Sequence, residues 1–368
     1  MIITDARQHL YRPFDTDLLP AEAALKLADL GITTLAELRD HWAYGNRLLI
    51  REYLGEGALR FVTASPGAML ATRGSTSQPS NVVNLLEAGR PAPLVRHARG
   101  VILPESERRT PAAAPAARAR ATRGGMTLAS RLPKPAGRPT VSLVDRFPAV
   151  RDQKSRGTCV AFASVAFLEF HLTAQQGAAV ARHSEQFVYW ACKEDDQIPT
   201  DEGTYVRTAR NVLKTRGACL HRTWKYNPLP IANNEGQGPA PAGAIEEAKA
   251  SKWSGVRKLA ARNTGALRTA LDAGRPVVLS VKTFPNWDFD VVAQTGEISL
   301  PFPGSNSDGG HAICLVGYEL NPEFPGGGAF LFRNSWGTGW AKKEGRFGPG
   351  YGTLYFEYVE KYGLEAFA

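Results

Sequence analysis

The strongest constraint on this chain is a polar loop that leads directly into an apolar stretch, with a cysteine at the junction. Residues 153–158 are mostly polar and include Gly157, whereas residues 160–168 are almost entirely apolar. This pattern predicts a buried helix that begins at Cys159. The first turn of a helix carries unpaired N–H groups and a partial positive charge, and both favour a thiolate over a thiol. Cys159 is therefore a candidate nucleophile, and the same N–H groups could hold an oxyanion.

Two later segments supply the partners that such a nucleophile needs. His311 follows two glycines and opens an apolar stretch that reads as a buried strand, where glycines let another backbone pass close by. Asn334 ends the next apolar stretch and is followed by Trp336. An asparagine oxygen can accept the N–H of a histidine and fix its tautomer, and a neighbouring indole can shield that bond from water. Cys159, His311 and Asn334 are thus predicted to act as nucleophile, base and orienting residue.

Four segments together resemble the papain-like cysteine peptidases. They are residues 153–168, 184–186, 310–318 and 334–340, in this order, within a region that extends from Val141 to near Tyr362. The prolines and glycine at Pro301, Pro303 and Gly304 are similar to the bacterial branch of the family. The resemblance implies a thiol hydrolase that cleaves peptide bonds through an acyl-enzyme, without a cofactor or a metal ion.

The resemblance also implies roles for single residues. Gln153, six positions before the cysteine, matches the glutamine whose side-chain amide completes the oxyanion hole with the backbone N–H of Cys159. Trp336 matches the indole that covers the asparagine–histidine pair. The residues expected to line the substrate-binding cleft are Gly203, Gly310 and Trp336.

The implied fold class is α+β, with a helical lobe, a β-barrel-like sheet lobe and the active cleft between them. Cys159 would come from the helical lobe, and His311 and Asn334 from the sheet lobe. The pattern of Val, Leu, Phe and Tyr between glycines predicts strands. Their expected ranges are Pro276 to Val281, Ala312 to Tyr318, Ala329 to Arg333 and Gly352 to Val359.

The chain departs from the family pattern at three places. Val160 stands where the family usually has tryptophan, Arg156 where it has a cysteine, and Gly203-Thr204 where it has a double glycine. These changes bear on substrate preference. Arg156 fits the loss of the family's usual disulfide and hence a reducing compartment. Cys192, Cys219 and Cys314 are interpreted as reduced, buried thiols.

Three units are expected along the chain. Residues 1–102 show helical spacing of apolar residues from Pro20 to Leu54, and Thr34 with Glu37 fits a capping box. This unit is interpreted as a small helical domain with a regulatory or targeting role, and residues 20–60 weakly resemble a helix-hairpin-helix. Residues 103–140 are rich in Pro, Ala and Arg and are predicted to form an extended linker. Residues 141–368 form the peptidase-like unit.

Charge and hydropathy bear on partners and location. Residues 101–140 hold 8 basic and 2 acidic residues, so this short segment carries +6 of the net charge of +9. The excess therefore does not indicate a folded nucleic-acid-binding face, and the expected partners are a protein or peptide substrate and a protein docked on residues 1–102. Neither an apolar run long enough to span a membrane nor a signal peptide is visible, which predicts a cytoplasmic protein.

Two alternatives to a peptidase remain open from the sequence. A peptide ligase or transpeptidase would use the same site, with an amine in place of water. A binding or adaptor protein would keep the fold without turnover, although such proteins usually lose the nucleophile or the histidine. Reaction of Cys159 with a thiol-directed epoxide separates the adaptor from the two enzymes.

Overall fold

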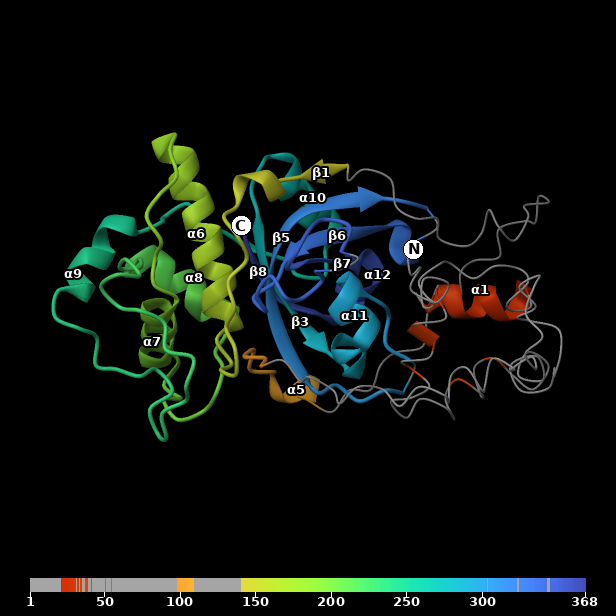
Figure 1. The fold of residues 1–368 in the computed structure, drawn as a ribbon, viewed down its shortest axis with the longest axis horizontal. Helices are drawn as coiled ribbons and strands as arrows, with labels where there is room; N and C mark the ends of the chain where they lie inside the picture. The colour runs from red at the N-terminus through yellow and green to blue at the C-terminus, as the bar shows by residue number, and fades with distance from the viewer. Residues whose placement is uncertain are drawn as a thin grey trace, which may run out of the picture.

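The computed structural model describes residues 21–30, 32, 34, 37–38, 41, 50, 54, 98–108 and 140–368, apart from 303, 323, 343 and 344. Residues from 140 onward form a lobe of helices and a lobe built around a sheet, which lie side by side in Figure 1. This arrangement confirms the α+β class predicted from the sequence.

The helical lobe is organised around a long buried helix. The apolar residues that follow Cys159 are buried on nearly every face of this helix, because it packs against other helices on one side and against strand β5 of the sheet lobe on the other. Ser184 caps the next helix by accepting a hydrogen bond from the backbone N–H of Phe187. The helices are α6 (Cys159–Gln176), α7 (Glu185–Asp196), α8 (Val206–Thr215), α9 (Ala244–Ala248) and the 3-10 turn η5 (Lys249–Ser251).

The strands of the described residues form one sheet of mostly antiparallel pairs. Its path runs β2-β8-β3-β5-β6-β7-β4, and β1 pairs with β5. The strands are β1 (Val141–Ser142), β2 (Lys258–Leu259), β3 (Val277–Thr283), β4 (Glu297–Ile298), β5 (Gly309–Leu320), β6 (Gly328–Arg333), β7 (Tyr351–Tyr355) and β8 (Gly363–Phe367). Strands β3 and β6 are buried along their whole length, as expected for apolar strands covered on both faces.

Three of the four predicted strands are confirmed as β3, β5 and β6, and the fourth is partly wrong. The strand expected from Gly352 to Val359 ends at Tyr355, and helix α12 (Phe356–Tyr362) follows at once. Short apolar runs fit either structure, and here Phe356 and Val359 are buried on a helix. The remaining elements of this lobe are η4 (Val144–Arg146), α10 (Thr264–Asp272), η6 (Pro285–Asp288), α11 (Asp290–Thr295) and η7 (Pro325–Gly327).

The described N-terminal residues contain helix α1 (Ala21–Asp29) and the predicted capping box. The backbone N–H of Glu37 donates to the Thr34 hydroxyl at 3.2 Å, and the N–H of Thr34 donates to the Glu37 carboxylate at 3.1 Å, which confirms the box. His41 packs edge-on against Phe289 and Phe302, with ring centroids 4.6 Å apart in both cases. Most of the residues of the helix-hairpin-helix resemblance lie outside the described residues.

One helical turn, α5 (Glu105–Arg108), lies within the range predicted to be an extended linker. Glu107 forms ion pairs with Lys282 of β3 at 3.0 Å and with Arg262 at 2.9 Å. Lys282 is buried, so a carboxylate from outside the sheet lobe compensates its charge. Long-range ion pairs therefore hold residues 105–108 in place, and the local Pro and Arg content gives no sign of them.

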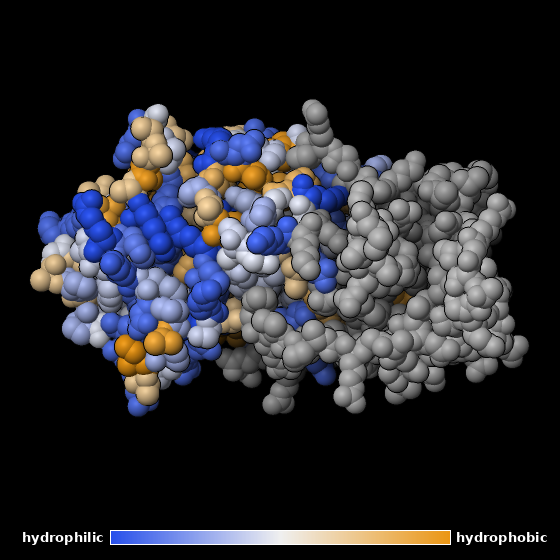
Figure 2. All heavy atoms as spheres, in the orientation of Figure 1, coloured by the Kyte–Doolittle hydropathy of each residue, from blue (hydrophilic) through white to orange (hydrophobic). Residues whose placement is uncertain are grey.

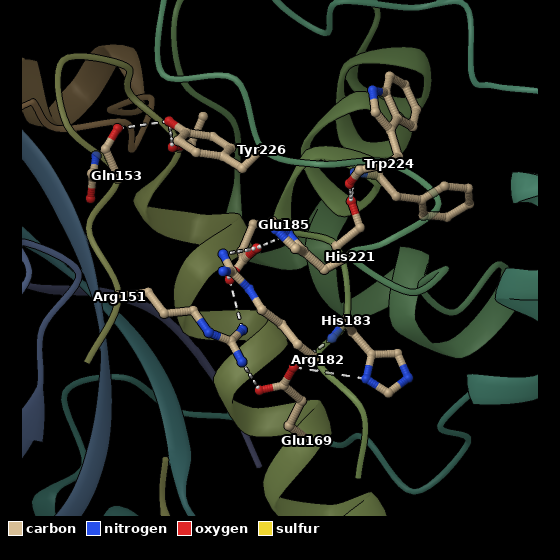
Figure 3. A network of polar contacts seen from close by, with 12 residues as sticks. Arg151, Gln153, Glu169, Arg182, His183, Glu185, His221, Trp224 and Tyr226 are labelled. Atoms are coloured by element: carbon tan, nitrogen blue, oxygen red, sulfur yellow. Dashed lines mark hydrogen bonds and ion pairs between the residues drawn. The ribbon is translucent and has the colours of Figure 1, made fainter. Parts of the chain in front are cut away.

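An ionic network ties the loop before α6 to the two helices behind it (Figure 3). The guanidinium of Arg151 donates to Glu169 of α6 and to Glu185 of α7, both at 2.7 Å. Glu169 also accepts the backbone N–H of His183 at 2.7 Å. Because Arg151 lies two residues before Gln153, this network fixes the start of the loop that leads to Cys159.

Arg156 cross-links the same loop to the outer part of the helical lobe. Its guanidinium donates to the side-chain oxygen of Gln186 at 2.9 Å and to the carbonyls of Asn227 and Glu235 at 2.8 and 2.5 Å. The side chain is almost fully buried, at 1% exposed. An arginine at the position of the family's cysteine thus holds the loop by hydrogen bonds.

We expect the substitution Arg156→Met to lower the free energy of unfolding by about 3 kcal/mol, because it leaves three acceptors, among them the buried side chain of Gln186, without their charged donor. Urea denaturation followed by circular dichroism measures this change. Arg222→Met, at a side chain that is 76% exposed, is the matched control and should leave the midpoint unchanged. A loss below about 1 kcal/mol for Arg156→Met would contradict the cross-linking role.

The outer face of the helical lobe is mainly hydrophilic (Figure 2). The large apolar residues exposed in the described part are Leu229, Ile231, Ile245 and Leu320. In the same part of the chain, no helix combines the length and the apolar character that crossing a membrane requires.

Candidate active site

Cys159 is the first residue of α6, as predicted, and it is completely buried where the helix meets β5. Two backbone N–H groups donate to its sulfur: Ala312 at 3.3 Å and Gly100 at 3.2 Å. Burial raises the pKa of the thiol to about 11, although the N–H donors of Ala312, Gly100 and Val160 act to lower it. The expectation of a lowered pKa is therefore wrong in this structure, because the exclusion of water from the sulfur outweighs the effect of the N–H groups.

His311 and Asn334 meet across neighbouring strands of the sheet lobe. His311 lies on β5 and Asn334 directly follows β6, and the Nε2 atom of His311 lies 2.8 Å from the Oδ1 atom of Asn334. Trp336 covers the histidine, with ring centroids 4.7 Å apart. With Nε2 bonded to the asparagine, Nδ1 is the ring nitrogen suited to exchange a proton with a thiol.

Gln153 is buried between the loop and the end of β6. Its side-chain oxygen accepts the hydroxyl of Ser335 at 2.5 Å, which leaves the amide NH₂ as the group that faces the cleft. That NH₂ donates to the carbonyl of Arg156 at 2.8 Å and to the carbonyl of Ala98 at 3.0 Å. The amide thus already holds a peptide carbonyl oxygen that comes from outside the lobe.

A stretch of the chain itself occupies the cleft, and we call residues 98–103 the cleft segment. Val101 donates its N–H to the carbonyl of Gly310 at 3.1 Å. Thr204 accepts from Ile102 at 3.2 Å and donates to the carbonyl of Gly100 at 2.9 Å, which is a parallel pairing. In Figure 1 this segment and α5 run along the boundary between the two lobes.

The fit of the cleft segment around Gly100 is too close for any side chain. A Cβ atom at Gly100 would lie 1.6 Å from the carbonyl oxygen of Gly157, and one at Gly203 would lie 2.8 Å from the carbonyl oxygen of Gly100. Gly203 also has a φ of +91°, in the left-handed region that favours glycine. These contacts explain why the chain has glycine at these positions.

Arg99 fixes the other side of the cleft segment by ion pairs. Its guanidinium lies 2.6 Å from the carboxylate of Asp288 and 2.6 Å from that of Asp308. Burial acts to lower the pKa of Arg99, but the two carboxylates outweigh it and raise that pKa. The arginine therefore stays charged within the cleft.

The sulfur of Cys159 contacts the backbone N–H of Ala312, which directly follows His311, and the cleft segment contacts Gln153 and Gly310. Of the cleft-lining glycines, Gly310 contacts the cleft segment through its carbonyl, whereas at Gly203 the neighbouring Thr204 makes the backbone hydrogen bonds. Trp336 lies on the histidine ring.

Sequence reasoning missed two features of this site. Trp287 packs edge-on against His311 at a centroid distance of 5.6 Å, and its indole N–H donates to the hydroxyl of Tyr358 at 2.7 Å. The cleft segment was divided between the predicted helical domain and the predicted linker. Neither feature carries a local motif, since each is defined by partners distant in the sequence.

Comparisons with known proteins show the family to which the chain belongs. The profile of the family described as papain family cysteine protease matches residues 143–352. A peptidase C1-like protein of Acanthamoeba polyphaga mimivirus, described as uncharacterized, is 26% identical over 216 residues, which are 56% of this chain and 64% of that protein. Papain from Carica papaya is 28% identical over 194 residues, which are 52% of this chain and 49% of that protein.

Among solved structures, xylellain, a cysteine protease from Xylella fastidiosa, is similar in fold. It superposes with a TM-score of 0.52 at 21% identity, over 63% of this chain and 89% of that chain. The chain spans only about half to two thirds of the length of the two proteins aligned by sequence. The family profile covers more than half of this chain, and on that match the chain belongs to the papain family of cysteine proteases.

Proposed function

We propose that this chain is a cysteine peptidase in which Cys159, His311, Asn334 and Gln153 carry the reaction. The observation that supports this most strongly is the meeting of three groups at the lobe boundary. The thiol lies at the N-terminus of α6, and the amide of Gln153 donates to the carbonyl of Ala98 in the cleft segment. His311 is bonded to Asn334 at 2.8 Å and directly precedes Ala312, whose N–H contacts the sulfur. The substrate is a protein or peptide.

In the proposed reaction the thiol proton moves to Nδ1 of His311, and the thiolate attacks a peptide carbonyl carbon. The resulting oxyanion accepts hydrogen bonds from the Cys159 backbone N–H and the Gln153 amide. His311 returns the proton to the leaving amine, so the C–N bond breaks and a thioester remains. Water then attacks the thioester with His311 as base, and the acid product and the thiol are released.

We propose further that the cleft segment holds the full chain in a state of low activity, which gives residues 1–102 a regulatory role. The group that faces the sulfur is the N–H of Gly100, at 3.2 Å, and an N–H cannot be attacked by a thiol. The parallel pairing with Thr204 also fills the backbone donors and acceptors that an incoming peptide would use. Departure of the segment would let water reach the sulfur and favour the thiolate.

Mass spectrometry after treatment with an epoxysuccinyl thiol inhibitor tests the proposed nucleophile. We expect one adduct, on Cys159, that forms about 5- to 150-fold faster in the full chain carrying Gly100→Ala than in the unaltered chain, because that substitution opens the cleft. The adduct should be lost in His311→Ala. Cys192, Cys219 and Cys314 are buried and should stay unmodified, and they serve as internal controls.

The outcomes of this experiment separate the candidate functions. An adduct on Cys159 together with hydrolysis of peptides supports the peptidase. An adduct together with transfer of the acyl group to an added amine, and no hydrolysis, would indicate a ligase or transpeptidase. Absence of the adduct in the opened chain would contradict both enzymes and leave a binding protein on a papain-like fold.

A further inference from the structure

Two carboxylates beside the cleft segment pair with the same arginine. Asp288 ends the 3-10 turn η6 and its side chain is 3% exposed, whereas Asp308 directly precedes β5 and its side chain is 28% exposed. The two come from different parts of the sheet lobe and converge on separate nitrogens of one guanidinium, each at 2.6 Å. Such a paired contact recognises a cationic side chain that reaches in from the cleft.

The carboxylate pair lies on the histidine side of the nucleophile. Asp288 follows Trp287, which packs on His311, and Asp308 precedes His311 by three residues. Arg99, which the pair holds, is adjacent to Gly100, whose N–H contacts the sulfur. A general acid must reach the nitrogen of the leaving amine, so the side of the cleft beside His311 receives the part of a substrate that follows the scissile bond.

We infer that Asp288 and Asp308 form a specificity subsite for arginine or lysine at the substrate residue that directly follows the scissile bond. This inference rests on the proposed peptidase function. In the closed chain Arg99 occupies the subsite, and in the open chain a basic side chain of the substrate takes its place.

The burial of Asp288 gives the physical reason for this preference. A carboxylate that is nearly excluded from water needs a compensating positive charge or several donors. When Arg99 withdraws, the positive charge beside both carboxylates is lost, and a peptide with a basic residue restores it. A peptide with a neutral residue of the same shape leaves both carboxylates without the cation, and an acidic residue adds repulsion.

A binding experiment tests the subsite without requiring turnover. The protein is the full chain carrying Arg99→Gln and Gly100→Ala, which vacate the cleft, and Cys159→Ala, which prevents reaction. The probes are two fluorescent octapeptides with the sequence of residues 97–104, one with arginine and one with its neutral isostere citrulline. By anisotropy we expect the arginine peptide to bind at least ~10-fold more tightly. Equal affinities, or no binding of either peptide, would overturn the inference.

Variants of the aspartates then test whether these carboxylates cause the difference in affinity between the two peptides. Asp308→Asn should reduce the difference between the two peptides, Asp288→Asn together with Asp308→Asn should remove it, and Asp308→Glu should retain most of it. Glu246→Gln, at an exposed carboxylate on α9, is the matched control and should leave the difference unchanged. A difference that Asp308→Asn leaves unchanged, or that survives the double variant, would also count against the inference.

Turnover distinguishes this inference from the proposed function. With Cys159 intact, the opened chain should cleave quenched peptides with arginine or lysine after the scissile bond at least ~10-fold faster in kcat/KM than the citrulline peptide. Equal rates would overturn the subsite but uphold the peptidase. Absence of all cleavage, with the preference in binding intact, would overturn the peptidase but uphold the subsite.

Discussion

Cys159→Ala is expected to reduce peptide hydrolysis by a factor of ~10³ or more, because no acyl-enzyme can form without the sulfur. The measurement is kcat/KM for a quenched peptide, made in the Gly100→Ala background so that the cleft is open. The fold should remain intact. The substitution removes one buried atom and leaves the N–H group of Ala312 without an acceptor, at a cost of about 1–3 kcal/mol.

Cys192→Ala is the matched control for this prediction. Cys192 is also completely buried and also lies on a helix, α7, where its thiol interacts with Asp195, Asp196 and Thr204. Its substitution should change stability to a similar extent and leave kcat/KM unaltered. Hydrolysis that persists in Cys159→Ala, or that falls equally in both variants, would rule out Cys159 as the nucleophile.

Gly100→Ala in the full chain is expected to raise peptidase activity about 5- to 150-fold. The new Cβ atom would lie 1.6 Å from the carbonyl oxygen of Gly157, and that oxygen belongs to backbone that cannot rotate away as a side chain could. Overpacking of this kind costs about 1–3 kcal/mol, and the cost falls on the closed state alone. The ratio of closed to open chain therefore drops by the corresponding factor.

Gly339→Ala is the control for this second prediction, since a Cβ atom there would meet nothing within 4 Å. The measurement is the initial rate of peptide hydrolysis beside the unaltered chain. Unchanged activity in Gly100→Ala, with an active site that still reacts with the epoxide, would contradict the proposed restraint by the cleft segment.

Local sequence patterns predicted the parts of the fold that depend on interactions between residues close together in the chain. The change from polar to apolar residues after Thr158 placed the start of α6 at Cys159, and the spacing of Thr34 and Glu37 predicted a capping box that is present. Three apolar runs between glycines became β3, β5 and β6. The fourth run was ambiguous between strand and helix. In the structure its first part forms β7 and its second part forms α12.

The placement of the cleft segment could not be predicted from such patterns. Residues 98–103 have neither a periodic pattern nor a motif, and they divide across the boundary expected at residue 102. Their placement comes from hydrogen bonds to Gly310 and Thr204 and from ion pairs to Asp288 and Asp308. Each of these partners lies about 100 or more residues away in the chain.

The sequence by itself therefore determined the family, the α+β class and the candidate nucleophile, base, orienting residue and oxyanion donor. Each of these depends on residue types at fixed short spacings, which encode helix starts, strand ends and side-chain chemistry. Only the tertiary structure decided that the chain fills its own cleft, that burial keeps the Cys159 thiol protonated there, and that Asp288 and Asp308 converge on one arginine. Those properties depend on distances between distant segments and on the exclusion of water, which arise only when the two lobes and the cleft segment pack together.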